Sequence, residues 1–378
     1  MNMRKSNIAT TVIFCALIVV LTVASIVNPV REYSETENRT LAQMPTFTLE
    51  ALFDGSFPMD YEEFITDQFV FRDQWITVKN YAELALGKKE SGGVYFGDGG
   101  YLIEKHELDT ATMESNIGYV ENFLSQVGDK YNVRVMVAPT ASLILSDKLP
   151  SYAPTWDQGG LLDRLNELEE FVDCREVLSL HASDAEQIYY RTDHHWTTTG
   201  AYYAYTALCE SLGIEPIAYD GFTKTVLSDE FYGTLAAKVN IDTDPDVLYT
   251  LDTDLGLSVS YNGGVTVTDT LYELRHLETR SKYSTFLNEN QPLVEITTEN
   301  KNGKTLLMIK DSYAHCMVPM LVNHYEHVIL FDLRGLTGGV IGNFIPMMES
   351  QGHTIDDIVI LYNAENFTED KYLVQLTK

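Results

Sequence analysis

The chain has 378 residues, a formal net charge of −29 and a hydrophobic content of 45%. This length and apolar content fit a large folded domain with extensions and exclude general disorder. The negative charge argues against binding to nucleic acid or to an anionic lipid surface, because both polyanions require Lys and Arg. We interpret the charge either as a source of solubility in an outer compartment or as an affinity for cationic or neutral polymers.

The first predicted element is a membrane-spanning helix. Residues Ile8 to Val27 are uncharged and mostly apolar, and they follow the basic residues Arg4 and Lys5. A run of this length can cross a bilayer, and basic residues on its N-terminal side predict a cytoplasmic N-terminus. A cleaved signal peptide is the alternative, but its apolar region would be shorter, and Ala24-Ser25-Ile26 is a poor cleavage site. We expect residues 1–28 to form a cytoplasmic stub and a single-pass signal anchor in the cell membrane, with the rest of the chain extracytoplasmic.

A stalk and a helical extension are predicted for residues 29–90. The segment from Arg31 to Thr40 is polar, and residues 60–81 have the apolar spacing of a helix. Residues 92–103 then predict a β-hairpin, because two apolar runs flank the turn sequence Gly97-Asp98-Gly99-Gly100. The hairpin begins the main domain, which we expect over residues 91–378.

Strand and helix patterns alternate within this main domain. Helices are predicted at residues 113–127, 161–170, 202–212 and 311–321, and strands at residues 133–138, 171–172, 187–190, 305–309, 328–331 and 357–361. This alternation is typical of an α/β fold with a mainly parallel sheet and helices on both faces. Residues from about 215 to 300 break the alternation, and we expect an inserted β-rich region there. Active sites in such sheets gather at the C-terminal ends of the strands.

The sequence carries no clear signature of a metal site, a cofactor site or a disulfide, and we expect no metal or cofactor to be bound. Asp242 to Asp254 is rich in Asp, but it lacks the ligand spacing and central Gly of a calcium loop and is interpreted as an acidic surface turn. Of the four cysteines, Cys15 lies in the predicted anchor, so the other three cannot all pair with one another. A bridge between Cys174 and Cys209 stays open, although small buried hydrophobic residues are the favoured interpretation.

The most informative stretch is Asp193-His194-His195-Trp196, which lies between an apolar run and a helix that opens at Thr197. A carboxylate this close to an imidazole indicates an oriented general base. We favour His195 as the base, because a spacing of two residues on a turn lets Asp193 reach back to the ring, whereas His194 would point the opposite way. A metal site formed by these three residues is the alternative, but adjacent histidines rarely converge on one ion.

Three predicted strand ends in the last third of the chain carry chemically useful side chains. Ser312 begins a helix, where its hydroxyl would lie beside N-terminal amides; helix capping by Asp311 and Ser312 is the alternative. Asn363 follows the last strand and could donate to an oxyanion or simply form a turn. Arg334 follows another of these strands and could bind substrate, orient the site or form a surface ion pair.

Together these residues supply the groups needed for nucleophilic acyl transfer. His195 would take the proton of Ser312, and Asp193 would hold the other ring nitrogen. The Ser312 amide and the Asn363 side chain would stabilise the oxyanion. The candidates for oxyanion or substrate contacts are Asn363, Arg334, Tyr313, His194 and Trp196.

At these residues the chain resembles the DHHW protein family, which is similar in turn to the SGNH-hydrolase-like alginate O-acetyltransferases. The matching sequences are Asp193-His194-His195-Trp196-Thr197, Lys310-Asp311-Ser312-Tyr313-Ala314 and, more loosely, Glu37 to Leu41 and Asp67 to Arg72. The resemblance covers about residue 35 to the C-terminus. The chain departs from the SGNH pattern at Lys310, which stands in the place of a Gly. The glycine of the second SGNH sequence block, whose amide would donate to the oxyanion, has no convincing counterpart, and Gly335 is a guess for it.

The resemblance implies an SGNH-hydrolase-like three-layer sandwich in which the Asp-x-His pair precedes the Ser along the chain. It also implies a membrane-anchored extracytoplasmic enzyme that moves acetyl groups onto hydroxyls of a cell-surface or secreted polysaccharide through an acyl-serine. Such systems use a multispanning membrane-bound O-acyltransferase as the partner that passes the acyl group outward. The alternatives are a carbohydrate acetyl esterase with the same Ser312, His195 and Asp193 triad, and a non-catalytic glycan-binding or assembly protein.

Overall fold

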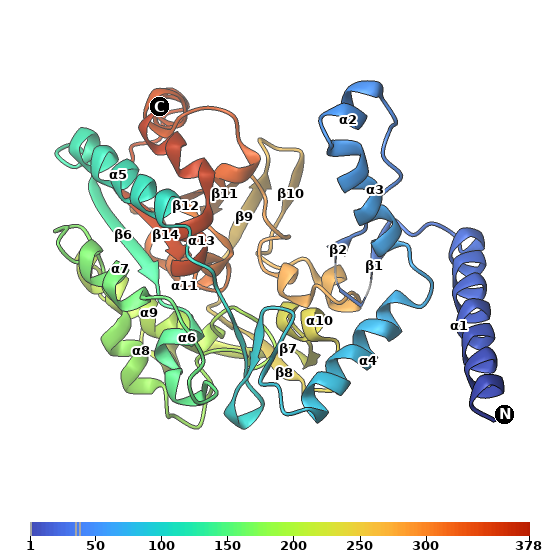
Figure 1. Ribbon diagram of the computed structural model, residues 1–378. Helices are drawn as coiled ribbons and strands as arrows, with labels where there is room; N and C mark the ends of the chain where they lie inside the picture. Colours follow the sequence, from blue (N-terminus) through green and yellow to red (C-terminus); the bar gives the residue numbers. More distant parts are fainter. Residues whose placement is uncertain (1, 35, 38) are drawn as a thin grey trace. The chain divides into compact units, whose positions relative to one another are not determined.

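The computed structural model describes residues 2–34, 36–37 and 39–378 (Figure 1). The chain divides into two compact units, which we describe separately. The first unit comprises the chain up to Lys88 together with the short segment 237–242, and the second comprises residues 89–236 and 243–378. The residues to which the sequence assigns chemistry, from Asp193 to Asn363, all lie in the second unit.

The first unit is mainly helical and begins with the predicted anchor. Its helices are α1 (Asn2–Val27), α2 (Leu49–Phe53), α3 (Ser56–Asp67) and α4 (Arg72–Ala85), and β1 (Tyr33–Ser34) pairs with β2 (Arg39–Thr40). Residues 7–27 of α1 are long and apolar enough to span a membrane. The prediction of one helix over residues 60–81 is wrong, because Phe71 adopts a left-handed φ of 58° and separates α3 from α4.

A large mixed sheet forms the centre of the second unit. Its strands, in spatial order, are β10 (Thr266–Thr268), β9 (Leu257–Tyr261), β11 (Leu293–Thr298), β13 (His327–Phe331), β12 (Thr305–Lys310), β14 (Asp357–Asn363) and β6 (Asn132–Ala138). The last four are parallel to one another, whereas β11 is antiparallel to both β13 and β9, and β9 is antiparallel to β10. The predicted α/β fold with a mostly parallel sheet is confirmed, and the C-terminal ends of the parallel strands share one edge.

The parallel strands are covered on both faces, which gives this unit three layers. In β12, Leu307 and Ile309 belong to one apolar core, and Leu306 and Met308 belong to the other. Side chains alternate along a strand, so a continuously apolar strand requires cover on both sides. The Leu307 core receives side chains from α5 (Thr110–Val127), α7 (Gln158–Leu165), α12 (Ile345–Ser350) and α13 (Ala364–Glu369). The Leu306 core receives them from α8 (Arg175–His181), α9 (Thr198–Leu212) and α11 (Val318–Leu321).

The β-rich region expected at about residues 215–300 contains strands, but it is not one insertion. β9, β10 and β11 extend the central sheet, whereas β7 (Thr223–Phe231) and β8 (Asp246–Asp252) form a separate antiparallel pair. α10 (Thr234–Val239) lies between β7 and β8 along the chain. The region therefore supplies three strands at one side of the main sheet, including the edge strand β10, and a separate two-stranded sheet.

Several shorter predictions can be compared directly with the structure. The hairpin is confirmed as β4 (Val94–Phe96) and β5 (Leu102–Glu104), which pair with the short β3 (Glu90–Ser91). The strands expected at residues 171–172 and 187–190 are wrong, since Phe171 and Tyr189 each make only an isolated bridge. Cys174 and Cys209 are buried free thiols, so the bridge between them that the sequence left open does not form.

Shortening a core side chain of β12, the strand that precedes Ser312, tests this account of the core. Leu307 is 0% exposed, so Leu307→Ala should lower the free energy of unfolding by about 2–5 kcal/mol. Urea unfolding of the full-length protein in detergent, followed by circular dichroism, measures the change. Val267→Ala on β10 is the matched control, because Val267 is 62% exposed and its truncation should cost less than about 0.5 kcal/mol. Equal effects of the two changes would contradict the account.

Candidate active site

Ser312 lies at the C-terminal edge of the central sheet. It is the first residue of η6 (Ser312–Cys316), a short 3-10 helical turn that follows β12 directly. The preceding residue, Asp311, is fully buried, and its Oδ1 accepts a hydrogen bond at 2.8 Å from the Tyr313 amide. The first amides of a helical turn lack partners within the turn, so Ser312 presents its hydroxyl beside groups that can donate hydrogen bonds.

The second oxygen of Asp311 ties β12 to its neighbour β14. It accepts hydrogen bonds from the Asn363 amide at 2.8 Å, from Asn363 Nδ2 at 2.7 Å and from Asn366 Nδ2 at 2.9 Å. Asn363 Oδ1 in turn accepts from the backbone amides of Glu365 and Asn366 at 3.0 Å each, which begins α13. The Asn363 side chain therefore positions Asp311 and, through it, the Ser312 turn. The sequence also predicted that the Asn363 side chain donates to an oxyanion. For the second proton of Asn363 Nδ2 this stays a prediction.

The Asp193–Trp196 segment forms a loop that leads into α9 and is attached to the Ser312 turn by two aromatic residues. Trp196 Nε1 donates to the Tyr313 carbonyl at 2.9 Å, and the Tyr313 hydroxyl donates to the His194 carbonyl at 2.5 Å. Both aromatic side chains are 0% exposed. Trp196 and Tyr313 thus hold the two parts of the site together, and a contact of either side chain with substrate stays a prediction.

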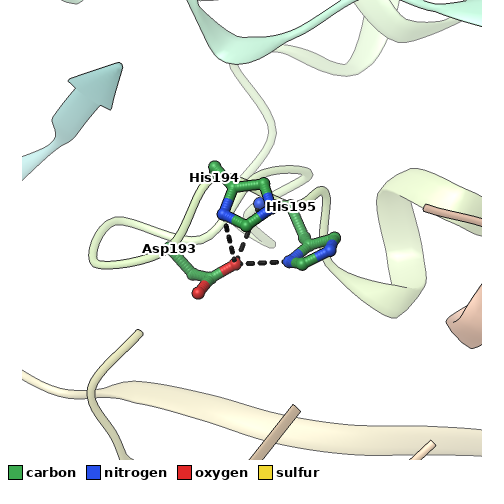
Figure 2. Close-up of side chains that lie close together, drawn as sticks. All are labelled: Asp193, His194 and His195. Atoms are coloured by element: carbon green, nitrogen blue, oxygen red, sulfur yellow. Dashed lines mark hydrogen bonds and ion pairs between the residues drawn. The ribbon is translucent and has the colours of Figure 1, made fainter. Parts of the chain in front are cut away.

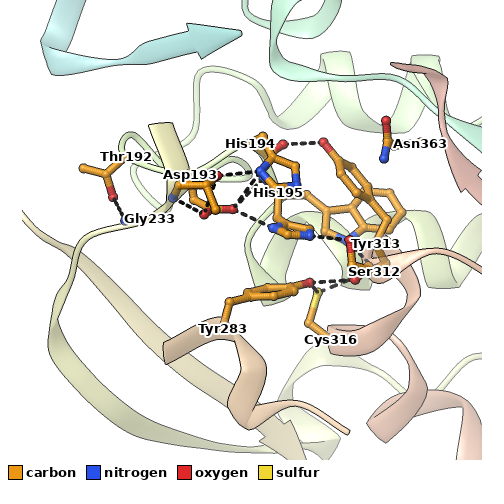
Figure 3. A network of polar contacts seen from close by, with 12 residues as sticks. Thr192, Asp193, His194, His195, Gly233, Tyr283, Ser312, Tyr313, Cys316 and Asn363 are labelled. Carbon is orange, nitrogen blue, oxygen red and sulfur yellow. Dashed lines mark hydrogen bonds and ion pairs between the residues drawn. The ribbon is translucent and has the colours of Figure 1, made fainter. Parts of the chain in front are cut away.

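Asp193, His195 and Ser312 lie in one chain of hydrogen bonds (Figure 3). His195 Nδ1 is 2.5 Å from Asp193 Oδ1, and His195 Nε2 is 2.8 Å from Ser312 Oγ. A carboxylate can only accept, so Nδ1 carries the ring proton and Nε2 offers its lone pair to the hydroxyl. This arrangement suits the removal of a proton from Ser312 as its oxygen attacks an electrophile.

Asp193 is held in place by residues of the segment that follows β7. The Thr234 amide donates to Asp193 Oδ2 at 2.8 Å, and the Thr234 hydroxyl lies 3.2 Å from the same oxygen. A Cβ at Gly233 would lie 2.2 Å from Asp193 Cβ, so only glycine allows this approach. His194 Nδ1 contacts the Thr234 hydroxyl at 2.7 Å and lies 3.7 Å from Asp193 Oδ1 (Figure 2). His194 therefore flanks Asp193 and takes no part in the contact with Ser312.

The surroundings set the charge of each member of this chain. Burial lowers the pKa of His195, and the neighbouring His194 lowers it further, against the opposing effect of Asp193. Burial alone would raise the pKa of Asp193, but the adjacent imidazoles and the Thr234 amide outweigh it and hold that pKa far below its ordinary value. At neutral pH the site therefore contains an ionised carboxylate and a neutral imidazole, which is the state a general base requires.

The sequence did not indicate Tyr283 as part of the site. Its ring stacks on His195 with centroids 3.9 Å apart, and its hydroxyl donates to the Ser312 carbonyl at 3.1 Å. It belongs to the region whose pattern was irregular, and the chain contains 23 Tyr, so no local signal distinguishes it. Gly233 and Thr234 were missed for the same reason: only the path of the chain brings them to Asp193.

A buried cluster of basic groups lies behind the Ser312 turn. Lys310 Nζ is 2.7 Å from His315 Nε2 and 3.8 Å from Asp332, and burial lowers the pKa of Lys310 to about 8. Arg334 forms a two-point ion pair with Asp332 at 2.8 and 2.6 Å. The ion pair that the sequence offered as one interpretation of Arg334 is present, with Asp332 as the partner. Substrate binding by Arg334 stays a prediction.

The three residues Asp193, His194 and His195 offer ligand atoms within 4.8 Å of one another, which is close enough to bind a metal ion. In this arrangement both ring nitrogens of His195 already have partners, Asp193 on one side and Ser312 on the other. The same atoms cannot serve the hydrogen-bond chain and a metal at once. The expectation of a metal-free site stays a prediction.

Comparison with known proteins gives a family for the chain. The sequence model of the DHHW protein family matches residues 88–331, which include both the Asp193–Trp196 loop and the Ser312 turn. A search of curated proteins finds no match.

Solved structures show the same fold. A DHHW family protein from Eubacterium siraeum has a TM-score of 0.63 and 24% identity, covering 76% of this chain and 95% of that one. Bacillus cereus PatB1 has a TM-score of 0.59 and 20% identity, covering 73% of this chain and 97% of that one. A structure of Bacillus cereus PatB1 with a sulfonyl adduct has a TM-score of 0.58 and 18% identity, covering 74% and 99%. At these identities the likeness establishes a shared fold.

Labelling by phenylmethylsulfonyl fluoride should report the state of His195. We expect Ser312 to be sulfonylated, because His195 can accept its proton, and the rate should fall as the pH drops and the imidazole becomes protonated. Since the pKa of His195 is lowered from 6.5, the midpoint should lie below pH 6.5, while Asp193 stays ionised throughout. Mass spectrometry of time courses gives the rate and the labelled residue. A midpoint above pH 6.5, or labelling that persists in His195→Ala, would contradict this.

A methyl group at Gly233 should disturb Asp193 and thereby His195. Gly233→Ala places a Cβ 2.3 Å from Asp193 Oδ2, so the Asp193 side chain has to move away. A displacement of about 1 Å, passed on to His195, should slow sulfonylation of Ser312 by about 100-fold. Gly118→Ala in α5 is the control, because a Cβ there has no neighbour within 4 Å. An unchanged labelling rate in folded Gly233→Ala would show that the Asp193 position does not matter.

Proposed function

The chain belongs to the DHHW protein family, and we propose that it is a membrane-anchored, serine-dependent O-acetyltransferase that modifies hydroxyls of a polysaccharide. The observation that carries this proposal is the 2.8 Å contact between His195 Nε2 and Ser312 Oγ, with Asp193 2.5 Å behind the ring. This is the geometry of a nucleophile, a general base and its orienting carboxylate. The resemblance of the DHHW family to SGNH-hydrolase-like alginate O-acetyltransferases supports an acetyl group as the cargo and an SGNH-like arrangement of the fold.

In the first half of the reaction, Ser312 Oγ attacks the carbonyl carbon of an acetyl donor while His195 Nε2 takes the hydroxyl proton. The tetrahedral intermediate carries a negative charge on the former carbonyl oxygen. Collapse of the intermediate breaks the bond to the leaving group, which receives the proton from His195. The product is acetyl-Ser312 with a neutral His195. Asp193 stays ionised and stabilises the imidazolium that forms transiently.

In the second half, a sugar hydroxyl attacks acetyl-Ser312. His195 takes the proton of that hydroxyl, a second tetrahedral intermediate forms, and its collapse releases the O-acetylated sugar. The proton on His195 returns to Ser312 Oγ, which restores the starting state. If water attacks in place of the sugar, the same residues act as an acetyl esterase, so the two activities differ only in the acceptor.

The backbone amide of Ser312 is the best-supported oxyanion donor. It belongs to the first residue of the η6 turn, where an amide has no acceptor within the turn and partial positive charge gathers. The next amide, that of Tyr313, is already given to Asp311. Asn363 is the proposed second donor, because one proton of its Nδ2 is used by Asp311 and the other remains.

The setting of the enzyme is also a proposal. α1 supports a single-pass anchor, since residues 7–27 have the length and hydropathy of a membrane span. Arg4 and Lys5 precede the span, which favours a cytoplasmic N-terminus and an extracytoplasmic active site. On that side of the membrane, the acceptor is a cell-surface or secreted polysaccharide. A multispanning membrane-bound O-acyltransferase is the proposed partner that delivers the acetyl group.

Removal of the nucleophile tests the proposed function. Full-length protein in detergent is mixed with p-nitrophenyl acetate and with cellotetraose, chitotetraose or tetramannuronate, and both p-nitrophenol and sugar esters are measured. Ser312→Ala should abolish both products, and Asp193→Asn should lower the rate by up to about 10⁴-fold through the wrong imidazole tautomer. Ser258→Ala, on β9 of the same sheet, is the matched control and should keep full activity.

The results separate the three functions. Release of p-nitrophenol without formation of a sugar ester from any of the acceptors would favour the esterase. Full turnover by Ser312→Ala would remove the proposed mechanism, and the absence of any turnover by the wild-type protein would favour a non-catalytic glycan-binding or assembly role.

A further inference from the structure

Helix α4 of the first unit exposes apolar side chains along one side. Phe71, Trp75 and Val78 are 62%, 47% and 59% exposed, and their spacing of four and three residues places them on the same side of the helix. Leu86, at the C-terminal end of α4, continues this side and is also exposed. We call these four side chains the α4 stripe. A surface helix of a globular protein normally turns such a stripe toward its core.

The other side of α4 makes polar contacts within the first unit. Asp73 forms an ion pair with Arg31 at 2.9 Å, and the Asp73 carbonyl accepts from Asn240 Nδ2 at 3.2 Å. Asn80 is only 2% exposed and donates through Nδ2 to the Val239 carbonyl. These contacts fix the rotation of the helix, so the α4 stripe cannot turn inward without breaking them. An apolar face held outward in this way indicates a surface that contacts something other than water.

A hydrogen bond places the start of the stripe beside the end of the apolar span. The Val70 amide donates to Ser25 Oγ at 3.3 Å, and Ser25 lies in the last turn of the span, which ends at Val27. Phe71 follows Val70 directly and is the first residue of the stripe. With α1 across the bilayer, the α4 stripe therefore begins where the chain leaves the membrane.

The composition of the stripe fits the boundary between lipid headgroups and acyl chains. Aromatic and aliphatic side chains enter this layer when a helix lies in the membrane surface, and Trp is enriched there. Lys79 and Lys88 flank the stripe and are paired with Glu83 at 3.5 and 2.8 Å. Their long side chains can extend to lipid phosphates. Because Glu83 offsets part of this basic charge, binding should not require an anionic lipid.

A second copy of the chain and a helix of a partner protein are the other occupants that an exposed apolar face can take. A protein contact can lie anywhere on the surface of the first unit. A lipid contact has to begin near the end of the span, and the bond between Val70 and Ser25 puts the α4 stripe there. The position of the stripe therefore favours lipid.

We propose that the α4 stripe is a lipid-binding surface that seats the first unit on the leaflet from which the C-terminal end of α1 emerges. Its apolar side chains enter the leaflet to about 5–10 Å, the depth typical of a helix that lies in the interface. The chain after the span is thereby held against the membrane and does not act as a free spacer. The inference rests on the anchoring role proposed for α1 and not on acetyl transfer.

Quenching of Trp75 by brominated lipid tests the proposal. Full-length protein is reconstituted into phosphatidylcholine vesicles whose acyl chains carry bromine near the carbonyl end, near the chain end, or not at all. Bromine quenches indole fluorescence on contact, so bromine near the carbonyl end should quench the emission of Trp75, and bromine near the chain end should quench it less. Trp75→Phe should abolish the quenching. Trp156→Phe, the same change in the second unit, is the matched control and should keep it.

Flotation of the vesicles separates this inference from the anchor, and neither readout depends on acetyl transfer. A protein that floats with the vesicles but shows the same quenching with and without Trp75 would overturn the lipid surface and leave the anchor. A protein that does not float would overturn both. Quenching that appears only when the protein is diluted in lipid would assign the stripe to a second copy. Stronger quenching by bromine at the chain end would assign it to the bilayer core, where a partner's membrane helix would pack. Either result would overturn the proposal.

A probe at Val78 repeats the test with Trp75 intact. Val78→Cys in a Cys15→Ser background is labelled with a nitrobenzoxadiazole fluorophore, since the other three cysteines are buried. Its emission should shift to the blue on reconstitution and be quenched by bromine near the carbonyl end. Val267→Cys on β10 is the matched control, because Val267 is exposed to a similar extent, and its probe should stay in water. Equal quenching at the two positions would overturn the proposal, because contact with lipid would then not be specific to the stripe.

Discussion

The hydrogen bond between His195 Nε2 and Ser312 Oγ joins residues that are 117 positions apart, and the rest of the site depends on it. β12 brings Ser312 to the C-terminal edge of the sheet, while His195 comes from the loop before α9. Two further hydrogen bonds, through the buried Trp196 and Tyr313, fasten that loop to the Ser312 turn. Because these bonds flank the reactive contact, the distance between base and nucleophile is fixed by rigid aromatic side chains and not by flexible ones.

Two buried aspartates perform different tasks in this arrangement. Asp193 orients His195 and stabilises the imidazolium that forms when His195 takes the proton, whereas Asp311 connects the ends of β12 and β14 through the Asn363 side chain. Each carboxylate accepts several hydrogen bonds, which is how a buried charge is stabilised in a folded protein. Asp311 therefore couples the nucleophile to the end of β14 and to the first turn of α13.

Much of this could be predicted from the sequence, because the signals are local. The apolar strands, the helix after Thr197 and the Asp193, His195 and Ser312 set all follow from short patterns of residues. The contributions of Tyr283 and Thr234 could not be predicted, because they depend on how an irregular region crosses the sheet edge. The burial of Tyr313 was also missed, since a sequence does not show which aromatic side chains lie inside. The break at Phe71 depends on one backbone angle, φ 58°, that the apolar spacing does not encode.

The central claim is that Ser312 carries the acetyl group between donor and acceptor. Rapid quenching of the full-length protein with p-nitrophenyl acetate, followed by peptide mass spectrometry, measures acetyl-Ser312 directly. The account predicts that one acetyl group accumulates on Ser312 and disappears when an oligosaccharide acceptor is added, as a matching amount of sugar ester forms. An acetyl group on another residue, or sugar ester formed while Ser312 is never acetylated, would contradict it.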